Sequence, residues 1–273
     1  MFALFHYQFL QNALFAASLV AIVAAVVGYF LLARGLTFAG HALSHVGFAG
    51  AAAGLVAGVD PVFGLLAFTV LGAIGIAIFG RRLNERDVTI GIFLAFILGL
   101  GALFISLYTG YAERAYSILF GTILGISRMD ILITAIFSLV TLLGMAAIFR
   151  PLLFSSFDPE VAEARGVPTA WLSLIFLVLV AVTVSMAVQV VGVLLIFTLL
   201  VGPAATAMRL AHDPKRAIAI AMVLGLMYSW LGILLAANGN WPVSFYIAAL
   251  SFAVYLPVRL SSNTERRIKE PVI

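Results

Sequence analysis

The chain has 273 residues, of which 64% are hydrophobic and 10% are charged, whereas about 25% of residues are charged in an ordinary soluble domain. A soluble fold of this length cannot hide so much apolar surface, and intrinsic disorder needs the opposite composition. The composition therefore excludes a soluble protein and predicts one whose main solvent is membrane lipid. The sequence contains no cysteine, which excludes disulfides and thiolate metal sites.

Nine apolar runs have roughly the 20 residues that a membrane-spanning helix needs. The runs are continuous, whereas the strands of a membrane β-barrel would alternate apolar with polar residues. The predicted spans are 12–33, 37–58, 61–80, 88–109, 129–149, 169–188, 190–210, 216–236 and 242–260. The predicted fold is therefore an all-α integral membrane bundle of about nine helices, a single domain over 1–273, and the polar segment 261–273 is expected to be a loosely ordered cytoplasmic tail.

The basic residues lie in short loops between the apolar runs, so membrane topology explains the net charge of +4 better than a nucleic-acid partner does. If the N-terminus is outside, 13 of the 15 Lys and Arg residues lie inside, and only Arg114 and Arg128 lie outside. Basic residues favour the cytoplasmic side, which predicts an outer N-terminus and an inner C-terminus. The segment 111–129 is too polar for another span and is predicted to be an outer-face helix or a re-entrant element.

The start of the second predicted span contains a pair of histidines, His41 and His45. Residues four apart share one helix face, so both imidazoles can reach the same small object. His45 lies roughly 12 Å along the helix from Thr37, which brings it toward the middle of the membrane. An ionisable residue at that depth indicates a functional site, and two imidazoles suit zinc and other first-row metals. Proton transfer, or polar contacts that hold two helices together, are the alternatives.

The same span continues with a glycine at every fourth position, at Gly50, Gly54 and Gly58. Small residues at this spacing let a second helix approach closely. The stripe therefore predicts a helix-packing face and places the second span in the interior of the bundle.

The cytoplasmic loop after the fifth span encodes a short helix of its own. Asp158 is a good N-cap, and Pro159 follows it at the first helical position. Glu160 suits the positive end of the helix dipole and Arg165 the negative end, while Gly166 ends the helix. Its acidic residues argue against a helix resting on lipid headgroups, so the loop is predicted to dock a cytoplasmic partner.

In the seventh span, Gly202 and Pro203 interrupt an apolar run. Proline removes a helix hydrogen bond, so this position is either a harmless kink or part of a gate. The chain has no phosphate-binding loop ending in Lys-Ser or Lys-Thr. Any uphill transport must therefore draw its energy from an ion gradient or from another subunit.

Four motifs, in this order and spacing, resemble the membrane permease subunits of bacterial zinc/manganese/iron-type ABC importers. They are GHALSHVGFAG at 40–50, AYSILFGTILGIS at 115–127, FDPEVAEARGVP at 157–168 and VGVLLIFTLLVGPAATAMRL at 191–210. The resemblance implies a homodimeric permease of the type II importer kind in the bacterial cytoplasmic membrane. It also implies two cytoplasmic ATPase subunits, an external metal-binding protein, and no catalytic site or permanent cofactor on this chain.

In that resemblance, His41 and His45 match positions that bind metal in transit, and 158–168, with Glu163 and Arg165, matches the helix that couples to the ATPase. Family members often carry Asp at the position of His41. Imidazole in place of a carboxylate favours zinc over manganese, so zinc is the predicted cargo, with manganese or iron as the alternative. A gradient-driven transporter and an intramembrane metalloenzyme remain as rival functions.

Overall fold

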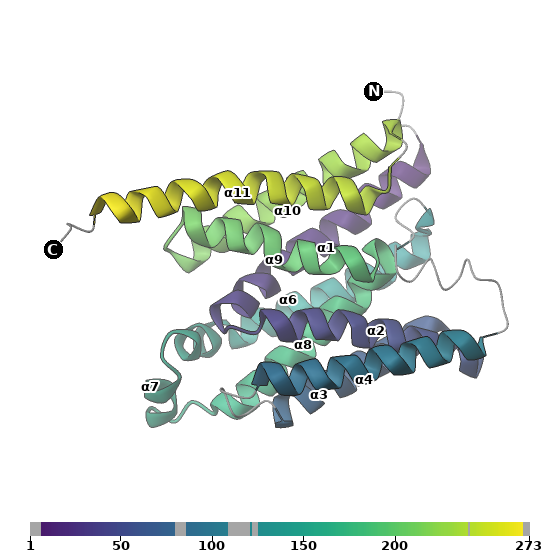
Figure 1. The fold of residues 1–273 in the computed structure, drawn as a ribbon, viewed down its shortest axis with the longest axis horizontal. Helices are drawn as coiled ribbons and strands as arrows, with labels where there is room; N and C mark the ends of the chain where they lie inside the picture. Colours follow the sequence, from purple (N-terminus) through teal and green to yellow (C-terminus); the bar gives the residue numbers. More distant parts are fainter. Residues whose placement is uncertain (1–6, 80–85, 109–120, 122–124, 240, 270–273) are drawn as a thin grey trace.

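The computed structural model describes residues 7–79, 86–108, 121, 125–239 and 241–269, and over this part of the chain the regular structure is entirely helical (Figure 1). The helices are α1 (Gln8–Ala33), α2 (Thr37–Ala57), α3 (Pro61–Phe79), α4 (Arg86–Leu107), α6 (Arg128–Phe157), α7 (Pro159–Ala164), α8 (Thr169–Val191), α9 (Val193–Leu210), α10 (Pro214–Asn238) and α11 (Val243–Lys269). Each of the nine predicted spans corresponds to one long helix.

Eight of the described helices are long and apolar enough to cross a membrane, and α2 is not among them. Its length of 21 residues is sufficient, but His41 and His45 make it less hydrophobic than its neighbours. The composition of α2 is instead suited to a helix enclosed by others. Twelve of its residues are buried, and α3, α4, α8 and α9 all pack against it.

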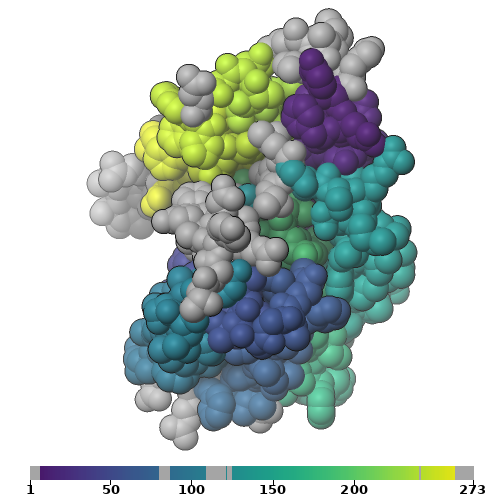
Figure 2. Space-filling view, turned by 90° about the vertical axis from the view of Figure 1, so that its right-hand side faces the viewer, coloured from purple at the N-terminus to yellow at the C-terminus, as the bar shows by residue number. Residues whose placement is uncertain are grey.

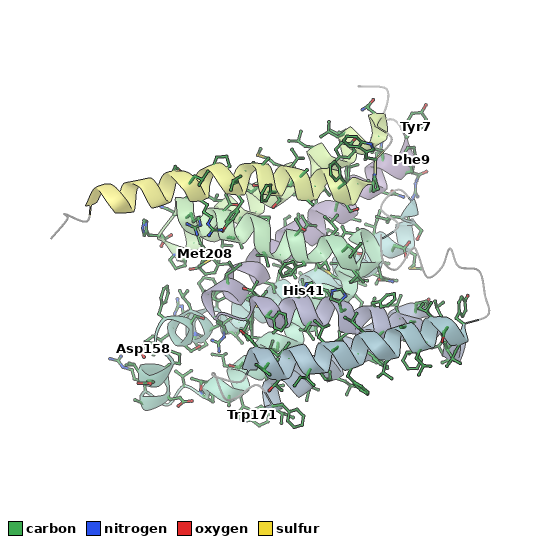
Figure 3. The ribbon with its side chains drawn as sticks, viewed as in Figure 1. Tyr7, Phe9, His41, Asp158, Trp171 and Met208 are labelled. Atoms are coloured by element: carbon green, nitrogen blue, oxygen red, sulfur yellow. The ribbon has the colours of Figure 1, made fainter. Side chains whose placement is uncertain are left out.

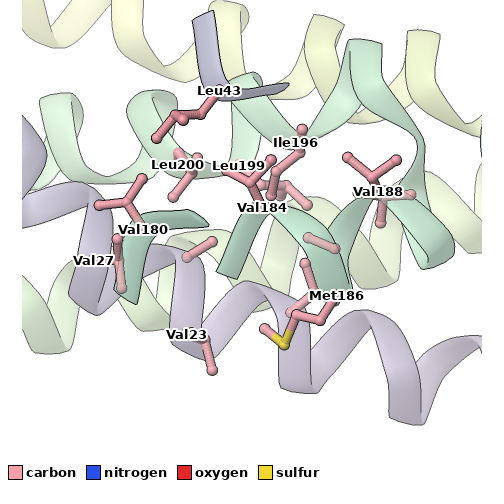
Figure 4. Packing of buried hydrophobic residues seen from close by; sticks show 14 of the residues in the cluster. Val23, Val27, Leu43, Val180, Val184, Met186, Val188, Ile196, Leu199 and Leu200 are labelled. Carbon is pink, nitrogen blue, oxygen red and sulfur yellow. The ribbon is translucent and has the colours of Figure 1, made fainter. Parts of the chain in front are cut away.

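The centre of the bundle is formed by α1 and α8, whose most apolar stretches are 78% and 72% buried, whereas only 11% of the corresponding stretch of α11 is buried. Side chains from α1, α2, α8 and α9 interlock in one continuous apolar core (Figure 4). Peripheral helices such as α4 and α11 leave large apolar side chains exposed on their outer faces. This arrangement is expected for a protein surrounded by lipid, because apolar side chains gain no hydrophobic free energy by moving from lipid into the protein.

The two ends of the bundle differ in the way that the distribution of basic residues predicts. In Figure 1, α1 begins at the right-hand end, and α11 ends at the left-hand end, where α7 also lies. Arg128 opens α6 at the right-hand end, whereas Arg34 follows α1 at the left-hand end. With basic residues favouring the cytoplasm, the left-hand end is the inner one and the right-hand end the outer one.

Two predicted boundaries are wrong. Helix α6 runs to Phe157 instead of ending near 149, and it contains Pro151. Burial of Leu152 and Ser155 against neighbouring helices offsets the backbone hydrogen bond that Pro151 lacks. Helix α11 continues to Lys269, so the predicted loose tail is helical as far as that residue, consistent with a run free of Gly and Pro that ends in the helix formers Glu, Arg and Lys. The predicted element at 111–129 lies largely outside the described residues.

Candidate functional site

The two histidines of α2 form a closely spaced pair. Because they lie four residues apart on one face, their rings meet edge to face, with centroids 4.7 Å apart and planes at 83°. Both side chains are half-buried, and Figure 3 shows His41 near the centre of the bundle in this view. The helix spacing that the sequence indicated thus brings the imidazoles together inside the protein.

Aromatic rings enclose His41. Phe197 of α9 lies across from it, with ring centroids 4.8 Å apart, and Phe38 lies one turn earlier on α2 at 6.5 Å. The Nδ1 atom of His41 is buried and has no hydrogen-bond partner among the described residues. Phe197 escaped the sequence analysis because a phenylalanine inside an apolar run carries no signal that distinguishes it from its neighbours.

The surroundings of the pair bear on the choice between a metal site and polar contacts that join helices. Hydrogen bonds between buried polar groups do link helices elsewhere in the bundle, as between Thr69 of α3 and Ser185 of α8, whose oxygens are 2.6 Å apart. The buried Nδ1 atom of His41 makes no such bond to another described residue. A buried polar atom without a partner is costly, so this nitrogen is suited to a partner that arrives from outside.

The separation of the rings is suited to one shared ion. Two imidazoles on a tetrahedral zinc ion, each with its nitrogen about 2.1 Å from the metal, have ring centroids roughly 5 Å apart. The observed 4.7 Å between His41 and His45 is close to that separation. Across the described part of the chain, no three His, Cys, Asp or Glu side chains gather in one place.

A cavity of about 660 Å³ lies at the outer end of the bundle. Its walls come from the α2–α3 turn, the start of α6 and the end of α8, and it is lined by Asp60, Asp130 and Gln189 among apolar residues. Figure 2 faces this end, with α1 in purple, α2–α4 in blue and α6 in teal. The two carboxylates also stabilise local turns, because Asp60 accepts a bond from the amide of Val62 and Asp130 from that of Ser127. Sequence reasoning missed this cavity since its residues are far apart along the chain.

The short helix α7 has the caps that the sequence indicated. The carboxylate of Asp158 accepts a hydrogen bond from the amide of Val161 at 3.0 Å, Pro159 opens the helix and Arg165 is the C-cap. Gly166 has φ +81°, the left-handed conformation that glycine adopts most easily after a helix. Figure 3 shows Asp158 at the inner end of the bundle. Glu160 is exposed, and so is Glu163, which accepts a hydrogen bond from Thr169 at the start of α8.

The glycine stripe of α2 divides into two parts. At Gly50, a side chain would collide with the backbone of Gly64 in α3, and at Gly54 it would lie 3.1 Å from Pro61. These two positions therefore let α2 and α3 approach backbone to backbone. The prediction is wrong for Gly58, which has open space around it and instead ends α2 in the left-handed conformation, with φ +71°.

Gly202 and Pro203 lie within a continuous helix, because α9 extends from Val193 to Leu210. A side chain at Gly202 would collide with the hydroxyl of Ser251 on α11, so the glycine allows close packing there. The chain reverses direction at Gly192, whose φ of 80° and ψ of 164° belong to a region that only glycine commonly adopts.

Comparison with known proteins places the chain in a family. The sequence matches the ABC 3 transport family over residues 6–261. It is 32% identical to "Manganese import system permease protein ScaB" of Streptococcus gordonii, over 97% of this chain and 96% of that protein. It is also 32% identical to "Manganese transport system membrane protein MntC" of Listeria monocytogenes, over 84% of this chain and 82% of that protein.

A solved structure agrees with these relationships. The structure described as "PsaBC from Streptococcus pneumoniae in complex with Fab" superposes with a TM-score of 0.86 at 32% sequence identity, covering 98% of this chain and 99% of that one. The helical bundle therefore has the same fold as that solved structure. The chain belongs to the ABC 3 transport family, and it is a multi-pass permease of the bacterial inner membrane, not an enzyme.

Proposed function

We propose that this permease imports a divalent first-row transition metal and that His41 and His45 bind the ion in transit. The observation that carries the proposal is the half-buried imidazole pair, with ring centroids 4.7 Å apart and with the buried Nδ1 atom of His41 lacking a hydrogen-bond partner among the described residues. Family membership decides against the gradient-driven transporter and the intramembrane metalloenzyme that the sequence left open. Weak, two-ligand binding suits transport, because an ion held by a closed four-ligand cage would not be released inward.

Two observations favour different metals. The relatives named above are manganese permeases, so kinship favours manganese and does not support the zinc predicted from the sequence. Zinc remains a second candidate on the donor set, because neutral imidazoles suit zinc whereas manganese prefers carboxylate oxygens. The cargo we propose is therefore manganese, with zinc as the alternative that the site chemistry specifically favours.

The assembly we infer has two copies of this chain around a central pathway, two cytoplasmic ATPase subunits, and an external metal-binding protein that delivers the ion. The support is the resemblance to ABC importers together with α7. That helix is presented at the inner end, capped at both ends and carrying the exposed Glu160 and Glu163. The cavity at the outer end that Asp60 and Asp130 line is suited to receiving a cation, since carboxylates raise the local concentration of positive ions.

The test is the metal content of metal-limited cells that lack this chain and express the wild type, His41→Ala, His45→Ala or the double variant. Manganese, zinc and iron are quantified together. We expect the wild type to restore one of the three and each histidine variant to restore markedly less of it, because removing one of two ligands weakens ion binding. His212→Ala is the matched control, since His212 is exposed at the inner surface and distant in sequence from the pair.

The metal that the wild type restores identifies the cargo, and the histidine variants test the proposed binding site. If the wild type restores manganese, the cargo inferred from the manganese permease relatives is supported. If it restores zinc, the cargo favoured by the two imidazole ligands is supported. Full restoration by the double variant, at wild-type protein levels, would show that the histidines do not bind the cargo. If no metal depends on the chain, the proposed substrate class is wrong.

A further inference from the structure

The turn between α1 and α2 contains an arginine, Arg34, that has no part in the proposed metal binding. Arg34 is the C-cap of α1, and α2 begins three residues later at Thr37. The side chain is half-buried, although it lies at the inner end of the bundle, where water is close. A charged side chain that turns into the protein at such a position requires strong partners.

The guanidinium of Arg34 spans two distant segments. Its Nη1 atom donates to the hydroxyl of Ser155 at 2.8 Å, and its Nη2 atom donates to the hydroxyl of Ser173 at 2.6 Å. These partners lie 121 and 139 residues away along the chain. Hydrogen bonds from a charged donor are roughly twice as strong as those between neutral groups. The planar, forked guanidinium can hold both hydroxyls at once, which the single ammonium group of lysine cannot do in the same geometry.

The two serines lie on either side of α7. Ser155 is in the last turn of α6, just before α7, and Ser173 is in the second turn of α8, just after it. A cavity of about 540 Å³ is lined by Arg34, Ser155 and Ser173 together with Glu163 of α7. The arginine therefore joins both supports of α7 to the turn from which the histidine helix starts.

We propose that Arg34 is a positioning residue of the transport cycle: it fixes the spacing of the α6 and α8 ends that support α7 and connects them to the start of α2. A displacement of α7 is then transmitted to the helix that carries His41 and His45. This inference rests on the proposed docking of an ATPase to α7. Because of these contacts, a movement of the ATPase displaces α6, α8 and α2 together.

The experiment uses the complex of this chain with its ATPase in liposomes, supplied with the external metal-binding protein, and measures metal uptake and ATP hydrolysis in the same sample, with manganese, zinc and iron tested in parallel. We expect Arg34→Gln to lower the metal moved per ATP hydrolysed by about tenfold, the scale of losing one hydrogen bond to a charged group. Arg34→Lys should keep an intermediate ratio, because it retains the charge and loses the fork.

Two further variants separate positioning from general stability. Removing both hydroxyls, with Ser155→Ala and Ser173→Ala, should lower the ratio as Arg34→Gln does, and combining all three changes should add little, because the groups act as a unit. Arg150→Gln is the matched control: it removes the same charge from the inner part of α6, where Arg150 is exposed, and should leave the ratio unchanged.

An Arg34→Gln complex with a wild-type ratio of metal to ATP would overturn the inference, as would one with reduced yield or thermal stability but an unchanged ratio in the surviving complexes. If the wild-type complex itself moves none of the three metals, the proposed function fails and the inference fails with it. The two failures are distinguishable, because the first appears only in the variants.

Discussion

At the residue scale, we expect the side chain of His41 to have the most direct effect on which metal is transported. Its ring lies between that of His45, at 4.7 Å, and that of Phe197, at 4.8 Å. A nitrogen donor pair of this kind is suited to borderline metals, whereas a carboxylate in the same place would suit harder ions. If His41 binds the cargo as we propose, the identity of this one residue of α2 biases the permease between two metals without any change of fold.

We predict that His41→Asp shifts the preference of the permease from zinc toward manganese. A carboxylate is a harder ligand than imidazole, so manganese gains relative to zinc while His45 still supplies one nitrogen. The measurement is uptake of each metal in competition with the other, in cells expressing equal amounts of wild-type or variant protein. His45→Asp, which reverses the order of the two ligands on the same helix face, is the companion variant. Unchanged competition in His41→Asp would contradict a ligand role for this residue.

At the scale of elements, α7 is notable for how much of its structure depends on its caps. It has six residues, too few for a helix to be stable alone, and Asp158, Pro159 and Gly166 fix its two ends. Only Ala162 of its own residues is buried, which leaves the rest of the helix available to a partner. The element is thus held in shape by local hydrogen bonds and presented outward.

We predict that Asp158→Ala weakens association with the ATPase. Loss of an N-cap costs about 0.5–2 kcal/mol, a large effect on a helix of one and a half turns. Asp213 offers a matched control, because it caps α10 in the same way, accepting from the amide of Arg216 at 3.0 Å and preceding Pro214. The measurement is the amount of ATPase that co-purifies with each variant. Asp213→Ala should retain it, and equal loss in both variants would contradict a docking role for α7.

At the scale of the whole molecule, the most general property is its sidedness. Helix α1 starts at one end, and α7 and the end of α11 lie at the other (Figure 1). The absence of cysteine from the sequence makes this arrangement directly testable, because any cysteine introduced is unique.

We predict opposite labelling of two single-cysteine variants in intact cells. Val59→Cys, in the exposed turn between α2 and α3, should react with a membrane-impermeant maleimide added outside. Glu160→Cys, on the exposed face of α7, should react only after the membrane is permeabilised. Both positions are exposed in this chain, so in cells that express it without the proposed ATPase their labelling reports the side of the membrane on which each lies. The reverse pattern would invert the topology.

Much of this organisation could be predicted from the sequence, because a long apolar run, a capped turn and a four-residue histidine spacing are local signals. The end of α6 could not, since Pro151 locally favours a break, and the burial of Leu152 and Ser155 by other helices, which no local pattern shows, outweighs it. The contacts of Arg34 with Ser155 and Ser173 and the position of Phe197 opposite His41 depend on segments more than 100 residues away. No local pattern marks such partners.

The polarity of α2 also has a consequence for how the protein is made. A segment with two histidines and many small residues has little tendency to leave the protein-conducting channel for lipid by itself. Both neighbours, α1 and α3, have a mean hydropathy of 2.5 over their most apolar stretches, and the close contact of Gly50 with Gly64 pairs α2 with α3 as a hairpin. We therefore expect α2 to remain at the channel until α3 has been synthesised and to enter the bilayer with it, with the face of Gly50 and Gly54 already covered.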